Sequence, residues 1–315
     1  MTRIPHHLGY IVNFSFHVWY RVVQHYIGLR AGEHGIPEIT ILDARLDLST
    51  QLGALDTLID RGVDALIVTP VPGPGTEEII EKTRAAHIPT VIEANPVRGM
   101  STLVAICDYD AGWKAGQWAG RHLNSQNITR AVVLDLAYPA LRPCILRSEG
   151  FFEGLRSIVP DTVLKERVNG EARVETARTV ARNVLAQHPD INVVFGMDDE
   201  SIQGALQAVD MLGRGEAEPL LVGFGLAGDA DKDLLMKESC LKASLAMFPE
   251  WVGIRCVDQA VSLFNGSPVH LHDVAPTIPL TGSTLPTYYR KADDGWVPVF
   301  EAINAIEREE RCRRA

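Results

Sequence analysis

The 315-residue sequence has few cysteines, no long apolar run and no excess of positive charge, and each absence argues against a class of protein. Its five cysteines are widely spaced without a CxxC pair, so we expect no metal site; free thiols and an incidental disulfide fit equally well. No apolar run approaches the ~20 residues of a transmembrane helix. The net charge of −10 argues against a nucleic-acid partner, which clustered Lys and Arg would bind.

Sequence motifs of catalysis and nucleotide binding are also missing. The glycine stretches Gly73–Gly75 and Gly223–Gly225 match neither GxGxxG nor GxxxxGK[ST], and no GxSxG or HExxH motif occurs. We therefore expect no enzymatic activity and no cofactor. The segment Met1–Val12 lacks the basic, apolar and cleavage regions of a signal peptide. This predicts a cytoplasmic protein, or a periplasmic one if a signal sequence is missing from this start.

One pattern of secondary structure occurs twice in the chain. Gln51–Pro70 runs from an amphipathic helix into a buried strand, and Ala177–Met197 repeats that helix, polar turn and strand. Strands that alternate with helices of roughly 10 to 15 residues predict right-handed βαβ units and a parallel sheet covered on both faces. We therefore predict the α/β class, with two Rossmann-like lobes, a hinge of several segments and a cleft between the lobes.

The order of the expected elements predicts that the chain returns to its first lobe and then leaves it again. The predicted N-terminal lobe comprises residues 1–106 and 249–276, and the C-terminal lobe comprises 107–248 and 277–300. Residues 301–315 are predicted to form a C-terminal tail, in which basic and acidic residues alternate as on a solvated helix end.

Several segments together resemble the type I periplasmic binding protein superfamily, which includes ribose-binding-protein-like sugar receptors of ABC importers and the effector domains of LacI-type repressors. The resemblance spans about residues 8–290. It is carried by Gln51–Pro70, Ile88–Asn95, Asp108–Leu123, Arg147–Leu155, His188–Val209, Leu220–Gly225 and Ser244–Gly253. The resemblance implies a receptor whose two lobes close around a small polar ligand, such as a carbohydrate or polyol, and which delivers that ligand to an ABC permease.

A second interpretation is a cytoplasmic or sensor-partner ligand-binding domain of a signalling or transcription-regulating system. A repressor would need a helix-turn-helix ahead of residue 8, where this sequence leaves no room for one, so a repressor of that type would require a truncated sequence. The implied partners are therefore a small polar ligand and an ABC permease or a sensor protein, without nucleic acid and without a membrane span.

By the resemblance, ligand contacts come from loops at the ends of strands. In the first lobe the candidates are Phe16, His17, Trp19, Tyr20, Glu93 and Asn95. An aromatic ring can stack on the apolar face of a sugar or on a cation, and Trp19 is the first candidate for this role. The alternative is that some of these rings cap the first helix. The family's acidic position aligns with Ala94, so Glu93 or Asn95 would have to replace it.

In the second lobe the candidates are Arg142, Asp198 and Met247. The family's cleft arginine aligns with Ile145, so Arg142 is the candidate by proximity alone, in a loop ahead of a helix predicted over 147–158. Asp198 is expected to face the ligand and Asp199 to cap the next helix. Asp108 is expected to be a helix cap and hinge element.

The last two differences from the family concern polar side chains that would bind ligand hydroxyls. Gly225 stands where the family has an aspartate, and Met247 stands where it has a glutamine. A buried unpaired hydroxyl costs about 1–3 kcal/mol. The sequence therefore predicts a ligand that is smaller, less hydroxylated or more apolar than a pentopyranose.

Overall fold

The computed structural model describes residues 3–213 and 218–314, with side chains as far as residue 310. The chain divides into two compact units, which we describe separately. The first unit comprises Met1–Ile106 and Phe248–Ala275, and the second comprises Cys107–Met247 and Pro276–Ala315. The chain therefore passes from one unit to the other at three points.

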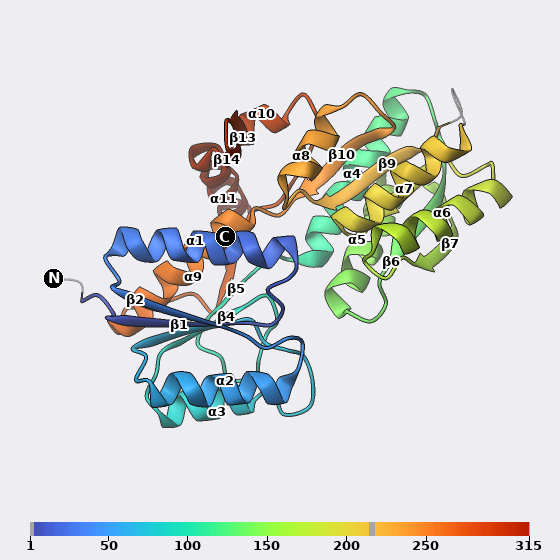
Figure 1. Ribbon diagram of the computed structural model, residues 1–315. Coiled ribbons are helices and arrows are strands. Elements are labelled where there is room, and N and C mark those ends of the chain that lie inside the picture. The colour runs from blue at the N-terminus through green and yellow to red at the C-terminus, as the bar shows by residue number, and fades with distance from the viewer. Residues whose placement is uncertain (1–2, 214–217, 315) are drawn as a thin grey trace. The chain divides into compact units, whose positions relative to one another are not determined.

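The first unit is a parallel sheet covered by helices on both faces. Its strands lie in the order β11-β5-β4-β3-β1-β2, and every pairing is parallel. The strands are β1 (His7–Val12), β2 (Glu38–Asp43), β3 (Ala65–Val68), β4 (Thr90–Glu93), β5 (Leu103–Ala105) and β11 (His272–Val274). The helices α1 (Val18–His34) and α9 (Pro249–Phe264) cover one face, and α2 (Leu48–Asp60) and α3 (Glu78–Ala85) cover the other (Figure 1).

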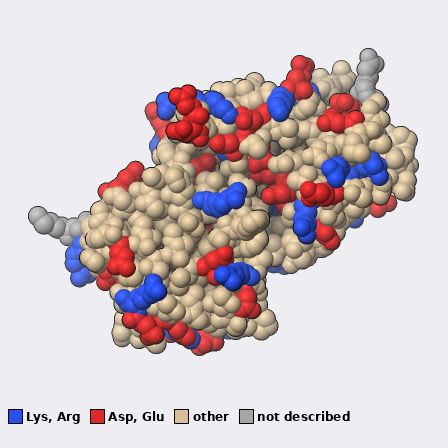
Figure 2. Space-filling view, viewed as in Figure 1, with Lys and Arg blue, Asp and Glu red and all other residues tan. Residues whose placement is uncertain are grey.

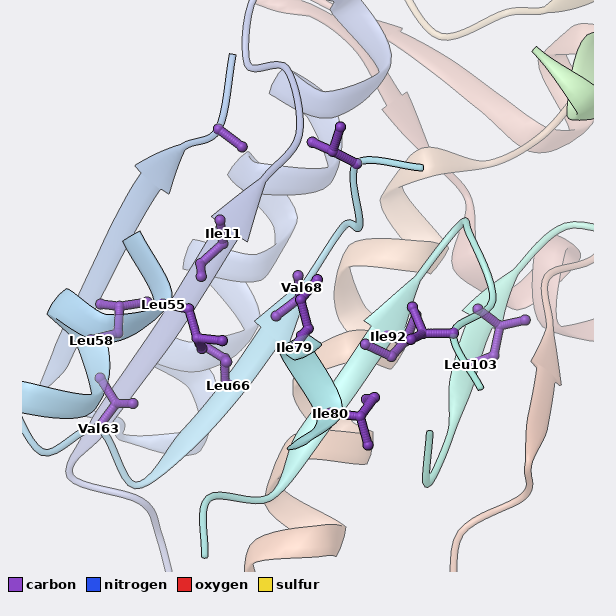
Figure 3. Packing of buried hydrophobic residues seen from close by; sticks show 13 residues of the cluster. Ile11, Leu55, Leu58, Val63, Leu66, Val68, Ile79, Ile80, Ile92 and Leu103 are labelled. Atoms are coloured by element: carbon purple, nitrogen blue, oxygen red, sulfur yellow. The ribbon is translucent and has the colours of Figure 1, made fainter. Parts of the chain in front are cut away.

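The alternation of side chains along the strands divides the core of the first unit into two layers. Ile11, Val68 and Ile92 point toward α2 and α3, where they pack with residues such as Leu55 and Ile79 (Figure 3). Because successive side chains of a strand point to opposite faces, the neighbouring residues of the same strands turn toward α1 and α9. This second layer contains the polar residues of the candidate site.

The second unit has the same plan, with one strand reversed. Its order is β12-β10-β9-β8-β6-β7, in which β12 runs antiparallel to β10 and the other pairings are parallel. The strands are β6 (Arg130–Ala137), β7 (Asp161–Asn169), β8 (Val193–Gly196), β9 (Leu220–Gly225), β10 (Leu241–Ala246) and β12 (Ile278–Leu280). The helices are α4 (Asp108–Ser125), α5 (Arg142–Ile158), α6 (Val174–Gln187), α7 (Asp199–Leu212) and α8 (Asp229–Met236). This fold, with parallel sheets in two lobes, is the predicted α/β class.

The C-terminal segment adds elements that the sequence analysis did not predict. A short helix, α10 (Leu285–Tyr288), leads into a hairpin of β13 (Tyr289–Ala292) and β14 (Gly295–Pro298). The last residues, which were predicted as a C-terminal tail with the charge pattern of a solvated helix end, form the helix α11 (Phe300–Arg314), and Ile303 on this helix is fully buried. Within the described residues, no helix has both the length and the apolar character required to cross a bilayer.

Helices α4 and α5 approach each other unusually closely because glycines line their contact. Gly112 and Gly116 of α4 face the backbone of α5, and Gly150 and Gly154 of α5 face the backbone of α4. A methyl group at any of these four positions would overlap a carbonyl oxygen of the opposite helix. The close approach therefore depends on the absence of side chains.

We expect Gly116→Ala to lower the free energy of unfolding by about 1–3 kcal/mol, because the added methyl group must push the two helices apart. The matched control is Gly53→Ala in α2, where an added Cβ meets no atom within 4 Å. There the same substitution should raise the free energy of unfolding by about 0.5–1 kcal/mol. Urea unfolding followed by circular dichroism measures both, and equal effects would show that the helix contact is not the cause.

Candidate functional site

Most of the predicted site residues lie at or near the carboxyl ends of strands. Glu93 is the last residue of β4, Asn95 follows it, and Phe16 to Tyr20 run from the loop after β1 into α1. In the second unit, Asp198 follows β8 and Met247 follows β10. The carboxyl ends of parallel strands share one edge of a sheet, and ligands of open α/β sheets bind outside that edge. Each unit therefore presents one set of these residues along a single edge.

The aromatic turn after β1 begins helix α1. His17 is the N-cap, and its Nδ1 accepts a hydrogen bond of 3.1 Å from the Trp19 backbone N–H. Trp19 and Tyr20 are half-buried in the first turn, whereas Phe16 is 79% exposed and contacts the ring of Phe14. The alternative role, that a ring side chain caps the first helix, thus holds for His17.

Glu93 lies beneath this turn, in the layer between the sheet and helices α1 and α9. Its side chain is only 1% exposed, and its Oε2 accepts a hydrogen bond of 2.7 Å from the Thr69 hydroxyl. The Thr69 hydroxyl in turn lies 3.1 Å from the Tyr10 hydroxyl. Burial raises the pKa of Glu93 to about 7, although hydrogen bonds from the Thr69 and Trp19 side chains oppose the rise. Trp19 and Glu93, predicted separately, are therefore neighbours.

Two buried oxygen atoms in this part of the first unit have no hydrogen-bond partner among the described residues. They are Oε1 of Glu93 and Oδ1 of Asn13, whose amide nitrogen donates to the Tyr20 hydroxyl at 3.2 Å. Asn13 is 5% exposed and follows β1 directly. Oδ1 of Asn13 is an acceptor, and so is Oε1 of Glu93 when the carboxyl is ionised; a buried acceptor without a donor costs about 1–3 kcal/mol. The first unit thus has acceptor capacity to spare at the carboxyl edge of its sheet.

The side chain of Asn95 is engaged with a neighbouring loop. Its Nδ2 donates a hydrogen bond of 3.1 Å to the carbonyl of Pro70, which follows β3. Between Glu93 and Asn95, Ala94 adopts a left-handed conformation with φ of 62°. The strand therefore ends in a tight turn, and its acid lies inside the unit, under the aromatic turn.

The raised pKa of Glu93 predicts a specific pH dependence of stability. Between about pH 4.5 and pH 7 the folded chain holds a proton that the unfolded chain has released, so stability falls as pH rises through this window. We expect Glu93→Gln, which cannot ionise, to reduce the difference in unfolding free energy between pH 5 and pH 8 by about 1–3 kcal/mol. Urea unfolding at the two pH values measures this, with Glu81→Gln on the exposed surface of α3 as control. An unchanged difference in Glu93→Gln would contradict the assignment.

Arg147 is the arginine that joins the strand ends of the second unit. Its Nε donates to Asp108 Oδ1 at 2.8 Å, and its Nη1 donates to the Met197 carbonyl at 3.3 Å. The guanidinium carbon lies 4.6 Å from the centre of the Phe224 ring. Burial disfavours the charged form of Arg147 and lowers its pKa. The neighbouring acidic groups, Asp108 foremost, together outweigh this effect, so the pKa of Arg147 is raised above its usual value. Arg147 remains a fixed cation.

Asp198, and not Asp199, caps helix α7. Asp198 is the N-cap of α7, and its Oδ1 accepts from the Ser201 backbone N–H at 2.8 Å. Asp199 instead accepts from the backbone N–H groups of Leu226 and Ala227 at 2.9 and 3.1 Å. The prediction that Asp199 caps this helix is therefore wrong, and burial raises the pKa of Asp198.

The carboxylate of Asp199 also explains why position 225 is a glycine. Gly225 has φ of 136°, and a Cβ built on it would collide with the Asp199 carboxylate. Strand β9 lacks an aspartate at position 225, but the carboxylate of Asp199, the first residue of α7, lies directly beside this position. The two carboxylate oxygens of Asp199 already accept hydrogen bonds from backbone N–H groups. Burial raises the pKa of Asp199 well above its usual value, and the nearby Asp231 carboxylate raises it further.

The remaining predictions in the second unit concern Arg142, Met247 and Asp108. Arg142 is exposed and is the first residue of α5, so the expectation that it lies in a loop ahead of the helix is wrong. Met247 is buried directly after β10. Asp108 is the first residue of α4, but the N-cap is Cys107, so the Asp108 carboxylate serves as the partner of Arg147 rather than as a cap.

Sequence reasoning missed Arg147 although the helical period indicates it. Cys144, Ser148, Phe151 and Leu155 are the buried residues that define the inner face of α5. Arg147 precedes Phe151 by four residues and therefore lies on the same face, one turn away. Arg142 does not lie on this inner face of α5. Helical phase would have selected Arg147, whereas distance along the chain selected Arg142.

Charges elsewhere on the surface are mixed. On the face drawn in Figure 2, Lys and Arg side chains are interspersed with Asp and Glu, and no extended basic patch is seen among the described residues. A nucleic-acid-binding surface would show clustered basic side chains. This face therefore offers no such surface.

Comparison with known proteins places the chain among binding proteins. The family model of the periplasmic binding protein domain matches residues 8–268. The chain is 30% identical over 246 residues to the ribose import binding protein RbsB of Bacillus subtilis, which covers 76% of this chain and 75% of that protein. It is 23% identical over 233 residues to RbsB of Escherichia coli, with 73% of this chain and 76% of that protein covered.

Solved structures share the fold. A solute-binding protein of an ABC transporter from Bacillus halodurans with bound myo-inositol superposes with a TM-score of 0.79 at 19% identity, covering 91% of this chain and 99% of that one. A periplasmic solute-binding protein from Actinobacillus succinogenes with bound D-allose has a TM-score of 0.78 at 16% identity, covering 90% and 99%. With its α/β fold and the match over residues 8–268, the chain belongs to the periplasmic binding protein domain family.

Proposed function

We propose that this chain is the substrate-binding receptor of an ABC importer for a sugar or polyol. The observation that carries the proposal is the 30% identity to a ribose import binding protein over three quarters of both chains. The polar and aromatic side chains at the strand ends of each unit support it, because they are the groups that bind hydroxyls and sugar rings.

The mechanism is closure of the two units on the ligand. The chain passes between the units at residues 106–107, 247–248 and 275–276, and in this proposal these three connections are the hinge. A ligand that contacts both units favours the closed arrangement, because the full set of contacts exists only there. The importer then recognises the closed form. No covalent bond is made or broken in this cycle.

The ligand contacts that we propose differ between the units. In the first unit the Trp19 ring packs against the apolar face of the ligand, and the acceptor oxygens nearby receive its hydroxyl protons. In the second unit Arg147 donates to ligand oxygens and Asp198 accepts from hydroxyls, each held in place by its own structural bond. A ligand with both donors and acceptors, such as a sugar or a polyol, satisfies both sets.

The receptor works on the outer side of the cytoplasmic membrane in this proposal, because an importer must receive its solute there. The alternative role as a cytoplasmic sensor domain predicts the opposite location. Fractionation of cells that carry the native gene distinguishes the two, since only an importer receptor is released with the periplasmic or secreted fraction.

A panel of D-ribose, D-allose, L-arabinose and myo-inositol tests the ligand class. We expect at least one compound to raise the Tm by a few degrees at a hundred times its Kd, where binding to the folded state contributes about 2.7 kcal/mol. In calorimetric titration, Trp19→Ala should lower the affinity for that compound tenfold or more. Trp118→Ala, which removes a half-buried tryptophan that stacks on His122 in α4, should leave the affinity unchanged. A panel without any shift would contradict the ligand class.

The two arginines of α5 provide a second test of the site. We expect Arg147→Lys to lower the affinity for the panel compound with the largest Tm shift about tenfold or more. Lysine cannot keep the hydrogen bonds to Asp108 and Met197 while it donates to a ligand. Arg142→Lys on the exposed first turn should bind as the wild type does. The reverse order of effects in calorimetric titration would restore Arg142 as the ligand contact.

A further inference from the structure

We propose that Glu93 is a positioning residue for Trp19, and that the proton on its carboxyl sets how firmly the indole ring is held for the ligand. The role as a ligand platform rests on the proposed function. The coupling between the two side chains is a property of the first unit alone and is testable without a ligand.

The position of Glu93 in the sheet creates this coupling. Ile92 turns toward α2 and α3, so the next residue, Glu93, turns toward α1 and α9 at the point where β4 ends. Thr69 and Tyr10 point into the same layer from the neighbouring strands, and the three side chains form a chain of hydrogen bonds. Trp19 reaches the carboxyl from the first turn of α1. A buried acid thus links the sheet to the aromatic turn.

The strength of this link depends on protonation. An ionised carboxylate accepts hydrogen bonds that are roughly twice as strong as those of a neutral group, so it fixes the Thr69 hydroxyl and the Trp19 indole firmly. A protonated carboxyl accepts more weakly, and its own O–H then needs an acceptor. The pKa of about 7 places the exchange between these two states at physiological pH, and no cation of the described residues contributes to it.

Two titratable groups beside the carboxyl, Tyr10 and Cys256, stay neutral near pH 7. Tyr10 faces it from β1 and Cys256 from α9; burial, and then the Glu93 charge, raise the pKa of both groups well above their usual values. Tyr20 of α1 lies beside Tyr10 and is also a phenol. Arg255 and Asp273 act on Cys256 and are joined to each other by hydrogen bonds of 2.9 and 2.6 Å. Tyr10 and Cys256 therefore stay neutral near pH 7, where Glu93 exchanges its proton.

His17 is the competing explanation for any pH effect on Trp19. Its ring nitrogen accepts the Trp19 backbone N–H, and protonation of that nitrogen would break the cap. His17→Asn provides the control, because asparagine is a favourable N-cap that does not titrate. Glu93→Gln removes the other candidate while it keeps an acceptor for Thr69 and Trp19.

The first measurement uses the ligand-free protein. The emission of Trp19 is obtained as the difference between the wild type and Trp19→Phe, from pH 5 to pH 8.5. We expect a single transition near pH 7 that persists in His17→Asn and disappears in Glu93→Gln. A transition that persists in Glu93→Gln, or no transition in the wild type, overturns the proposal. Should Glu93→Gln fail to fold, Thr69→Val should raise the midpoint, and an unchanged midpoint overturns the proposal.

The second measurement is the affinity for the compound of the panel with the largest Tm shift. We expect binding to be about three- to tenfold tighter at pH 8 than at pH 5.5 in the wild type, and Glu93→Gln to bind at both pH values as the wild type does at pH 5.5. Equal pH dependence in both proteins overturns the positioning role. If no panel compound binds while the emission still titrates, the proposed ligand class fails and the link between Glu93 and Trp19 stands.

Discussion

The parallel pairing of β1, β3 and β4 determines where the polar residues of the first unit lie. Leu66 pairs with Thr90 and Val68 with Ile92, while Ile11 pairs with Val68, so the three strands end at one level. The residues at or beyond these ends, Asn13, Thr69 and Glu93, therefore meet at one edge although they are far apart in sequence. A shift of one residue in this register would turn the whole set to the opposite face of the sheet.

In the second unit, the packing of two helices brings polar residues of the candidate site together. Asp108 and Arg147 lie in the N-terminal halves of α4 and α5, and their hydrogen bond of 2.8 Å joins the two helices where they are closely packed. The glycines of both helices permit that distance, since a single methyl group at Gly112 would strike the carbonyl of Arg147 itself. The packing of small residues thus has a consequence for the site, because it brings a buried cation and its carboxylate partner together.

The sequence contained enough information for the fold and for the position of several candidate residues at strand ends. Helical and strand periods predicted the two α/β units, because they follow from burial of apolar side chains. The prediction of Trp19 and Glu93 rested on the family resemblance, which implies ligand contacts in loops at strand ends. Local chemistry was harder: whether Asp198 or Asp199 caps α7 depends on the loop after β9, which lies far along the chain. Arg147 was missed because proximity in sequence was weighed above helical phase.

The unsatisfied acceptors of the first unit connect stability with binding. Removing the Glu93 carboxyl and the Asn13 amide from water has a cost that folding already includes, because both side chains are almost fully buried. A donor that reaches Oε1 of Glu93 or Oδ1 of Asn13 therefore gains a hydrogen bond without a further desolvation cost on the protein side. An apolar core at these positions would make the unit more stable and would remove the acceptors. The buried acceptors beneath the aromatic turn thus lower the stability of the first unit, and the same acceptors are available to hydrogen-bond donors of a ligand.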